Sequence, residues 1–250
     1  MNKFKLITIG TLPALWLIYL LFELITGRIS SSATLIANIL LLFLFGLTGY
    51  IIHLISTKHP KNYKIKNIII FLFILLVLDQ GVKLIIHLFF FNKSFDIISG
   101  FLSFQPIINS DGSWLNARFA TDISFTLLIC INIIALFLFL ELYRYIRKNN
   151  KCDFWGDMCF CFIFIGALCS LIDKVFYGGS LDFIGISDLF IADLKDIYIN
   201  IGLLFFIMSC YKSGFFNEEE TTFKDDIKAI KDFFKFIKSD ILRILKKEKA

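Results

Sequence analysis

Five aspartates and two lysines gather in one stretch of the chain, residues 166–202, between two strongly apolar runs. They are Asp173, Asp182, Asp188, Asp193 and Asp196, with Lys174 and Lys195. Carboxylates held at or near a membrane are costly, so they point to a functional site. Our interpretation is that Asp182 and Asp196 form a catalytic pair, although two loop aspartates are more often solvated than catalytic.

Two carboxylates held close together do not both ionise easily, so one of them keeps its proton. The ionised member is then a base that activates water, and the protonated member is an acid that polarises a carbonyl group. In this chain Asp182 is expected in the loop after the fifth apolar run, and Asp196 opens the sixth run. Two spans of one helical hairpin can bring both residues to the same depth, and we expect their carboxyl groups to converge.

The elements that would position these residues are membrane helices. The chain is 57% hydrophobic with a mean hydropathy of +0.75, whereas soluble domains have roughly 45–50% apolar residues. Six apolar runs are candidates for spanning a bilayer: Phe4–Ile25, Ala33–Ile55, Asn67–Phe91, Ile123–Tyr143, Trp155–Ile172 and Ile197–Tyr211. No clear signal-peptide cleavage site follows the first run, so we interpret it as a retained span.

The segment between the third and fourth runs, residues 92–122, has a different pattern. Two short β-like stretches, Phe95–Ile98 and Phe101–Ile108, are separated by turn residues such as Gly100. The sequence therefore predicts an all-α integral membrane helical bundle of about six transmembrane helices, with a small extracytoplasmic β-cradle. The six cysteines lack metal-ligand spacing, and we expect no metal and no other cofactor.

The distribution of lysine and arginine residues predicts the orientation. The segments before the first span, after the second and after the fourth are more basic than the segments on the other side, and basic loops stay in the cytoplasm. Both termini are therefore expected in the cytoplasm. The β-cradle and Asp182 are expected on the extracytoplasmic side of the plasma membrane.

A tail, residues 213–250, follows the last span. From Phe223 to Leu245 its apolar residues recur at steps of three and four, with lysines and an arginine on the other face. This pattern is typical of an amphipathic helix that lies on the inner leaflet. The alternative is a helix that binds a cytoplasmic partner or associates with itself.

Five motifs, in order along the chain, resemble those of the lipoprotein signal peptidases (type II signal peptidases) over residues from about Ile65 to Tyr211. They are the segments 79–83 (DQGVK), 109–114 (NSDGSW), 166–174 (GALCSLIDK), 181–184 (LDFI) and 193–202 (DLKDIYINIG). The family's counterparts are D-Q-x-x-K, an N-T/S-G segment that ends in an aromatic residue, G-A-L-G-N-L-I-D-R, V-D-F-I and N-x-A-D. The family consists of membrane aspartic proteases with four spans. The resemblance thus implies a four-helix core at residues 58–212 with the β-cradle at 92–122.

The resemblance also implies roles for single residues. Asp182 and Asp196 match the two catalytic aspartates, which activate water and polarise the scissile carbonyl. Asn109, Ser170 and Lys174 match positions that contact the substrate backbone.

Further residues match supporting positions. Asp79 and Lys83 are either a structural pair one helical turn apart or a support for the site and the lipid headgroup. Asp173 is expected to orient Lys174 or a helix end. Asp193 stands where the family has Asn and adds a negative charge close to the pair.

The activity implied is that of an endopeptidase of the bacterial plasma membrane. It would cut a lipid-modified prolipoprotein on the N-terminal side of the diacylglyceryl-cysteine. Membrane lipids are expected partners, and nucleic acids are not. Residues 1–57, expected to form two additional N-terminal transmembrane helices, and the tail lie outside the resemblance.

The chain departs from the family within the motifs. Cys169-Ser170 replaces Gly-Asn, Lys174 replaces Arg, and Asp193-Leu194-Lys195 replaces Asn-x-Ala. Lysine lacks the bidentate fork of arginine, so the second exchange changes how a substrate carbonyl is held. Two other hypotheses stay open: a catalytically silent relative that acts as a membrane scaffold or partner-binding protein, and a proton-coupled transporter that uses the same carboxylates.

Overall fold

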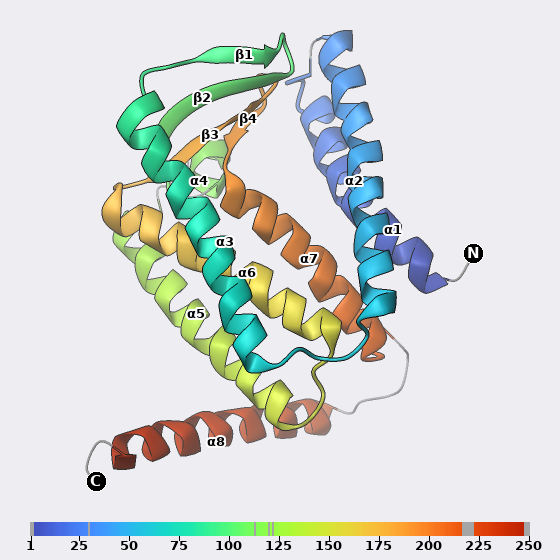
Figure 1. Cartoon of the computed structure of the whole chain (residues 1–250), viewed down its shortest axis with the longest axis vertical. Coiled ribbons are helices and arrows are strands. Elements are labelled where there is room, and N and C mark those ends of the chain that lie inside the picture. Colours follow the sequence, from blue (N-terminus) through green and yellow to red (C-terminus); the bar gives the residue numbers. More distant parts are fainter. Residues whose placement is uncertain are drawn as a thin grey trace.

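Six long helices form the body of the protein, shown here in a computed structural model (Figure 1). The structure describes residues 3–29, 31–112, 114–119, 121, 123–216 and 223–247. The long helices are α1 (Lys3–Ile25), α2 (Ser32–Lys58), α3 (Ile65–Ile85), α5 (Phe125–Lys148), α6 (Phe154–Phe176) and α7 (Leu194–Lys212). A π-helical turn, Ile86–Phe90, extends α3. All six are long and apolar enough to cross a membrane, so the predicted helical bundle is confirmed.

Helix α6 is central to the bundle, because it contacts α3, α5 and α7. Glycines let α6 and α7 approach closely. A Cβ atom on Gly166 of α6 would lie 2.7 Å from the Ile199 side chain, and one on Gly202 of α7 would lie 2.6 Å from that of Ile163. Small residues at helix contacts in membranes allow such close backbone packing. This contact fixes the start of α7 relative to the strand that follows α6.

A four-stranded antiparallel sheet lies at one end of the bundle, with the strand order β1-β2-β3-β4 (Figure 1). Strands β1 (Phe95–Ile98) and β2 (Leu102–Asn109) lie where the sequence predicts β-structure. Helix α4 (Trp114–Phe119) follows strand β2 along the chain.

The other two strands, β3 (Ser180–Ile186) and β4 (Phe190–Ala192), come from the segment after α6. The interpretation of this segment as a loop is wrong. Strand β3 pairs with both β2 and β4, and nearly all of its residues are buried. A strand buried on both faces shows no polar–apolar alternation, which is why the sequence pattern does not reveal it.

The N-terminal helices α1 and α2 pack against each other, and α1 also contacts α7. At the sheet end, Arg28 donates hydrogen bonds to the carbonyl oxygens of Asp188 (3.2 Å) and Leu189 (2.5 Å) in the β3–β4 turn. Arg28 and Arg118 both pair with the buried carboxylate of Glu23 on α1. The N-terminal helix pair α1–α2 therefore contacts both the sheet, through Arg28, and the bundle, through α7.

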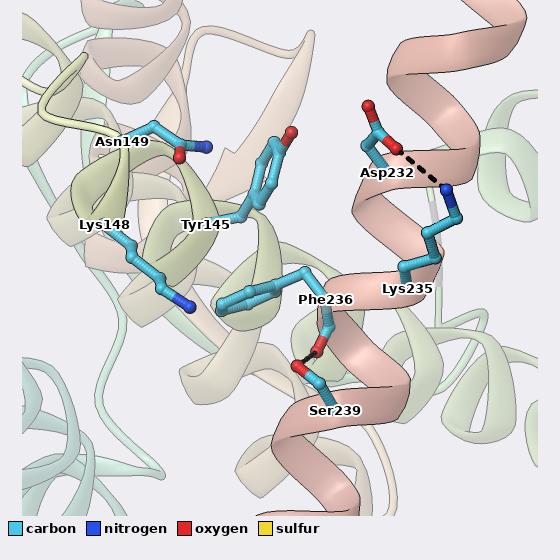
Figure 2. A pocket seen from close by; sticks show the side chains of 7 residues that line it. All are labelled: Tyr145, Lys148, Asn149, Asp232, Lys235, Phe236 and Ser239. Atoms are coloured by element: carbon cyan, nitrogen blue, oxygen red, sulfur yellow. Dashed lines mark hydrogen bonds and ion pairs between the residues drawn. The ribbon is translucent and has the colours of Figure 1, made fainter.

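Helix α8 (Phe223–Lys247) crosses the end of the bundle opposite the sheet (Figure 1). Buried Asp240 pairs with Arg144 of α5 at 2.6 Å, and the rings of Phe233 and Phe236 pack against Tyr145. Figure 2 shows the groove of about 370 Å³ between α5 and α8, which is lined by Tyr145, Lys148, Asn149, Asp232, Lys235, Phe236 and Ser239. The predicted tail helix is therefore present and docked on α5.

Candidate active site

The turn between α6 and β3 brings Asp182 back over the bundle. Gly178 adopts a positive φ of 66°, a conformation that glycine accepts without strain. A Cβ atom on Gly179 would lie 2.6 Å from the carbonyl oxygen of Asn109. Strands β2 and β3 therefore approach closely at this point, and Asn109 pairs with Ser180 in the sheet register.

Asp182 is buried on β3 and is held by three donors. Its Oδ1 accepts a hydrogen bond from Ser180 Oγ and lies 3.4 Å from Lys195 Nζ, and its Oδ2 accepts one from Asn109 Nδ2 at 3.2 Å. Burial raises the pKa of Asp182 above its usual value, and Lys195 and Ser180 offset part of that rise. The group therefore takes up a proton more readily than a solvated aspartate while its donors still favour the carboxylate.

Asp196 lies in the first turn of α7, where Asp193 caps the helix. The Asp193 carboxylate accepts the Asp196 N–H at 3.2 Å, and the Asp196 carboxylate accepts the Asp193 N–H at 3.1 Å. One carboxylate oxygen from each of Asp182, Asp193 and Asp196 lies within 4.8 Å of the other two. The carboxyl groups of Asp182 and Asp196 thus converge, as we expect from the sequence, with Asp193 as a third member.

Lys83 of α3 lies behind these aspartates as a fully buried cation. Its Nζ is 3.0 Å from Asp79, 2.6 Å from Asp173 and 2.5 Å from Asp193. Burial alone would raise the pKa of Asp193, but Lys195 and Lys83 outweigh burial and hold that pKa below its usual value. The Asp79–Lys83 contact is an ion pair one helical turn apart, and the same ammonium group contacts Asp193.

Asp173 and Lys174 have separate partners in the structure. Asp173 is expected to orient Lys174 or a helix end, and its carboxylate contacts Lys83 and accepts a hydrogen bond from Gln80 at 3.0 Å. Lys174 Nζ donates to Ser170 Oγ at 2.6 Å, one helical turn away. The two residues expected to bind a substrate backbone are thus bound to each other.

Sequence reasoning assigns no role to Lys195 or Ser180, which the structure places at the centre of the site. Lys195 Nζ donates to Ser180 Oγ and to Asp193 Oδ2, the latter at 2.6 Å. The available signal was a cation at the position where the resembling family has Ala. The three converging carboxylates have the spacing of a cation site, and in this chain the Lys195 ammonium supplies a positive charge there.

The family model described as signal peptidase (SPase) II matches residues 69–212. The chain belongs to the signal peptidase II family. All the predicted site residues, from Asp79 to Asp196, lie inside the matched region, whereas α1, α2 and α8 lie outside it. Signal peptidase II membership identifies the chain as a multi-pass membrane protease.

Two curated relatives of the signal peptidase II family illustrate the match. The lipoprotein signal peptidase of Staphylococcus epidermidis is 27% identical over 167 residues, which are 64% of this chain and 98% of the relative. That of Fusobacterium nucleatum is 31% identical over 159 residues, which are 61% of this chain and 90% of the relative. A solved bacterial membrane enzyme, determined by the in meso method at 2.3 Å resolution, has 25% identity and a TM-score of 0.52, and the match covers 66% of this chain and 98% of that one.

Proposed function

We propose that this protein is a lipoprotein signal peptidase that cuts lipid-modified prolipoproteins on the N-terminal side of the diacylglyceryl-cysteine. The observation that carries the proposal is the convergence of Asp182 and Asp196, whose carboxylate oxygens lie within 4.8 Å of each other. The two residues come from a strand and a helix that α6 positions against each other. A buried pair of this kind provides one acid and one base without a cofactor.

In the proposed reaction, Asp182 is the base because three donors stabilise its carboxylate. Asp182 takes a proton from water, and the water oxygen attacks the scissile carbonyl carbon. Asp196 donates its proton to the carbonyl oxygen, which gives a neutral tetrahedral intermediate. When the C–N bond breaks, the departing amine takes up the proton held by Asp182. Asp196 takes back a proton from one hydroxyl group of the intermediate as the carboxylic acid product forms, which restores both aspartates to their starting forms.

The site lies where the sheet meets the membrane helices, and this position suits a substrate with a lipid anchor. Strand β1 is exposed along its whole length, and its apolar residues Phe95, Ile97 and Ile98 are more than half exposed. Such an apolar surface is suited to acyl chains or membrane lipid. We infer that the acyl chains stay in hydrocarbon while the peptide bond reaches the aspartates.

The test is cleavage of a synthetic lipid-modified prolipoprotein peptide by the purified full-length protein, with the product identified by mass spectrometry. Asp182→Asn and Asp196→Asn are each expected to reduce the rate by about 10²- to 10⁴-fold, the usual contribution of one proton-transfer group. Asp188→Asn is the matched control, because Asp188 is exposed in the β3–β4 turn. This variant should cleave the peptide at the wild-type rate. A wild type no faster than the Asp182→Asn variant would contradict the proposal.

The docked position of α8 supports a membrane-surface role for this helix. Ile230, Phe234 and Ile241 remain exposed on the sector beside the face that contacts α5, and lysines such as Lys228 and Lys238 occupy the next sector. An apolar sector flanked by lysines suits an anionic leaflet. We infer that α8 lies on the cytoplasmic leaflet, with the sheet and Asp182 on the extracytoplasmic side.

A second candidate function is that of a catalytically silent relative that binds partners. The observation in its favour is the Lys195 ammonium inside the aspartate cluster, because a cation there can stand where the attacking water must bind. The cleavage assay distinguishes the two: a protein that binds the lipid-modified peptide tightly but leaves it intact would support this candidate.

A further inference from the structure

The aspartate site contains an ion pair that the sequence motif of the family does not have. At the positions of Asp193 and Lys195 the resembling family has Asn and Ala, so this chain carries one additional negative and one additional positive charge. The two side chains lie 2.6 Å apart and both are buried. A buried cation without a partner is strongly destabilising, so the two departures from the family pattern compensate each other.

The two members of the Asp193–Lys195 ion pair differ in how they contact Asp182. Lys195 Nζ lies 3.4 Å from Asp182 Oδ1 and also donates to Ser180 Oγ, which in turn donates to the same Oδ1. Asp193 directs its Oδ2 at Lys83 as well as at Lys195, and Lys195 also pairs with Asp173 at 3.7 Å. Lys195 is nevertheless the member of the pair that makes a direct ion pair with Asp182.

The other charged groups around Asp182 come from three helices: Asp79 and Lys83 from α3, Asp173 and Lys174 from α6, and Asp193 and Asp196 from α7. Among these helices' cations, Lys83 has three carboxylate partners of its own. Lys174 Nζ bonds to Ser170. Among the described residues, Lys195 is the cation that forms an ion pair with Asp182.

We propose that Lys195 is a positioning residue of the aspartate site, which keeps Asp182 in its carboxylate form and occupies Oδ1 so that Oδ2 faces the attacking water. The Oδ2 atom has Asn109 as its donor in the structure, and it retains a lone pair for a water proton. This inference rests on the proposed peptidase function and adds a residue to its machinery.

Removal of Lys195 and removal of Asp193 are expected to change the pKa of Asp182 in opposite directions. Removal of Lys195 takes away a cation 3.4 Å from Asp182, and opposite charges at this range change a carboxyl pKa by about one to three units. Lys195→Ala should therefore move the acidic limb of the pH–rate profile to higher pH by about one unit or more. Asp193→Asn should move that limb to lower pH, and the Asp193→Asn/Lys195→Ala double variant, with the family residues at both positions, should fall between them.

The experiment is to measure kcat/KM against pH for the full-length protein and these three variants, together with Lys195→Arg. Lys195→Arg keeps the charge and should restore the wild-type limb, which a purely structural role would not require. If the acidic limb of the pH–rate profile lies at the same pH in Lys195→Ala as in wild type, and only the rate is lower, the proposal is overturned. A silent wild type whose Lys195→Ala variant cleaves would also overturn it, because Lys195 would then obstruct the site.

A second readout makes the outcome independent of cleavage. The infrared band of protonated carboxyl groups can be titrated in the same proteins, and the part of the band that Asp182→Asn abolishes belongs to Asp182. Its midpoint should be higher in Lys195→Ala than in wild type and unchanged in Lys195→Arg. If no protein cleaves, the peptidase proposal fails, while this midpoint still decides the role of Lys195: an unchanged midpoint overturns it. If Lys195→Ala alone does not fold, the double variant is compared with Asp193→Asn instead: the Asp182 midpoint should be higher in the double variant, and an equal midpoint overturns the proposal.

Discussion

Lys83 Nζ of α3 and Asp193 Oδ2 at the start of α7 lie 2.5 Å apart, with both side chains fully buried. This ion pair joins the helix that begins the matched family region to the helix that carries Asp196. Lys83 also pairs with Asp173 of α6. Three helices of the bundle therefore meet at one ammonium group directly behind the aspartates.

The first prediction concerns that ammonium group. Lys83→Met keeps the length of the side chain but leaves Asp79, Asp173 and Asp193 with one cation fewer. Removal of one partner from a buried ion pair costs about 3–5 kcal/mol, so thermal unfolding in detergent should show a large drop in melting temperature. Lys235→Met is the control, because Lys235 pairs with Asp232 on the exposed face of α8. A Lys83→Met protein as stable as this control would show that the network contributes no net stability.

The second prediction concerns acid stability. The pKa of Asp193 is lowered from its ordinary value of 3.8 by Lys195 and Lys83 against the effect of burial. A carboxyl group with a lowered pKa in the folded state contributes stability above its unfolded pKa, and this contribution is lost as the pH falls through the folded pKa. Asp182, whose pKa is raised, has the opposite sign: its contribution is present at low pH and is lost as the pH rises through 3.8 toward the folded pKa.

Substitution of Asp193 isolates its contribution to the pH dependence of stability. The melting temperature of the wild type should fall on acidification from about pH 5 to about pH 3. Asp193→Asn should be less stable at neutral pH and should lose less stability over that range. Asp188→Asn should follow the wild type, because Asp188 is exposed. Equal slopes for Asp193→Asn and wild type would show that Asp193 is not the group responsible.

The third prediction tests the contact between α6 and α7. A Cβ atom on Gly202 would lie 2.6 Å from the side chain and 3.2 Å from the backbone nitrogen of Ile163. Gly202→Ala should therefore push the helices apart, destabilise the protein by about 1–3 kcal/mol as overpacking does, and lower cleavage by separating the aspartates. Gly81→Ala in α3 is the matched control, because nothing lies within 4 Å of its added Cβ. If both variants behave as wild type, the close packing does not position the site.

The fourth prediction concerns the docking of α8. Arg144 Nη1 of α5 pairs with buried Asp240 of α8 at 2.6 Å. Asp240→Ala should release α8 from α5 and speed hydrogen exchange over Phe223–Lys247, whereas Asp232→Ala, which removes an exposed-face pair with Lys235, should not. Cleavage should be retained in both, because α8 lies at the opposite end from the aspartates. Unchanged exchange in Asp240→Ala would mean that the aromatic contacts to Tyr145 suffice.

The membrane helices follow from the sequence because the bilayer imposes the length and apolarity of each span. The β1–β2 hairpin follows from its turn residues. Strand β3 does not, because burial on both faces removes the alternation that marks a strand, and Asp182 within it reads as a loop residue. The two aspartates could be named from their motifs, and the Asp79–Lys83 pair from its helical spacing, but the pairing of Lys83 with Asp173 and Asp193 could not. Those two contacts join residues far apart in sequence, and only the packing of three helices determines them.

Arg28 fastens α1 to the β3–β4 turn, and α1 contacts α7 along the bundle. A substrate anchored by acyl chains diffuses in two dimensions and meets the protein at its perimeter. The sector of that perimeter beside α7 is occupied by α1. Under the proposed function, we therefore expect an anchored peptide to approach from the sectors in which α3 and α5 face the bilayer, so that the N-terminal helices restrict its direction of approach.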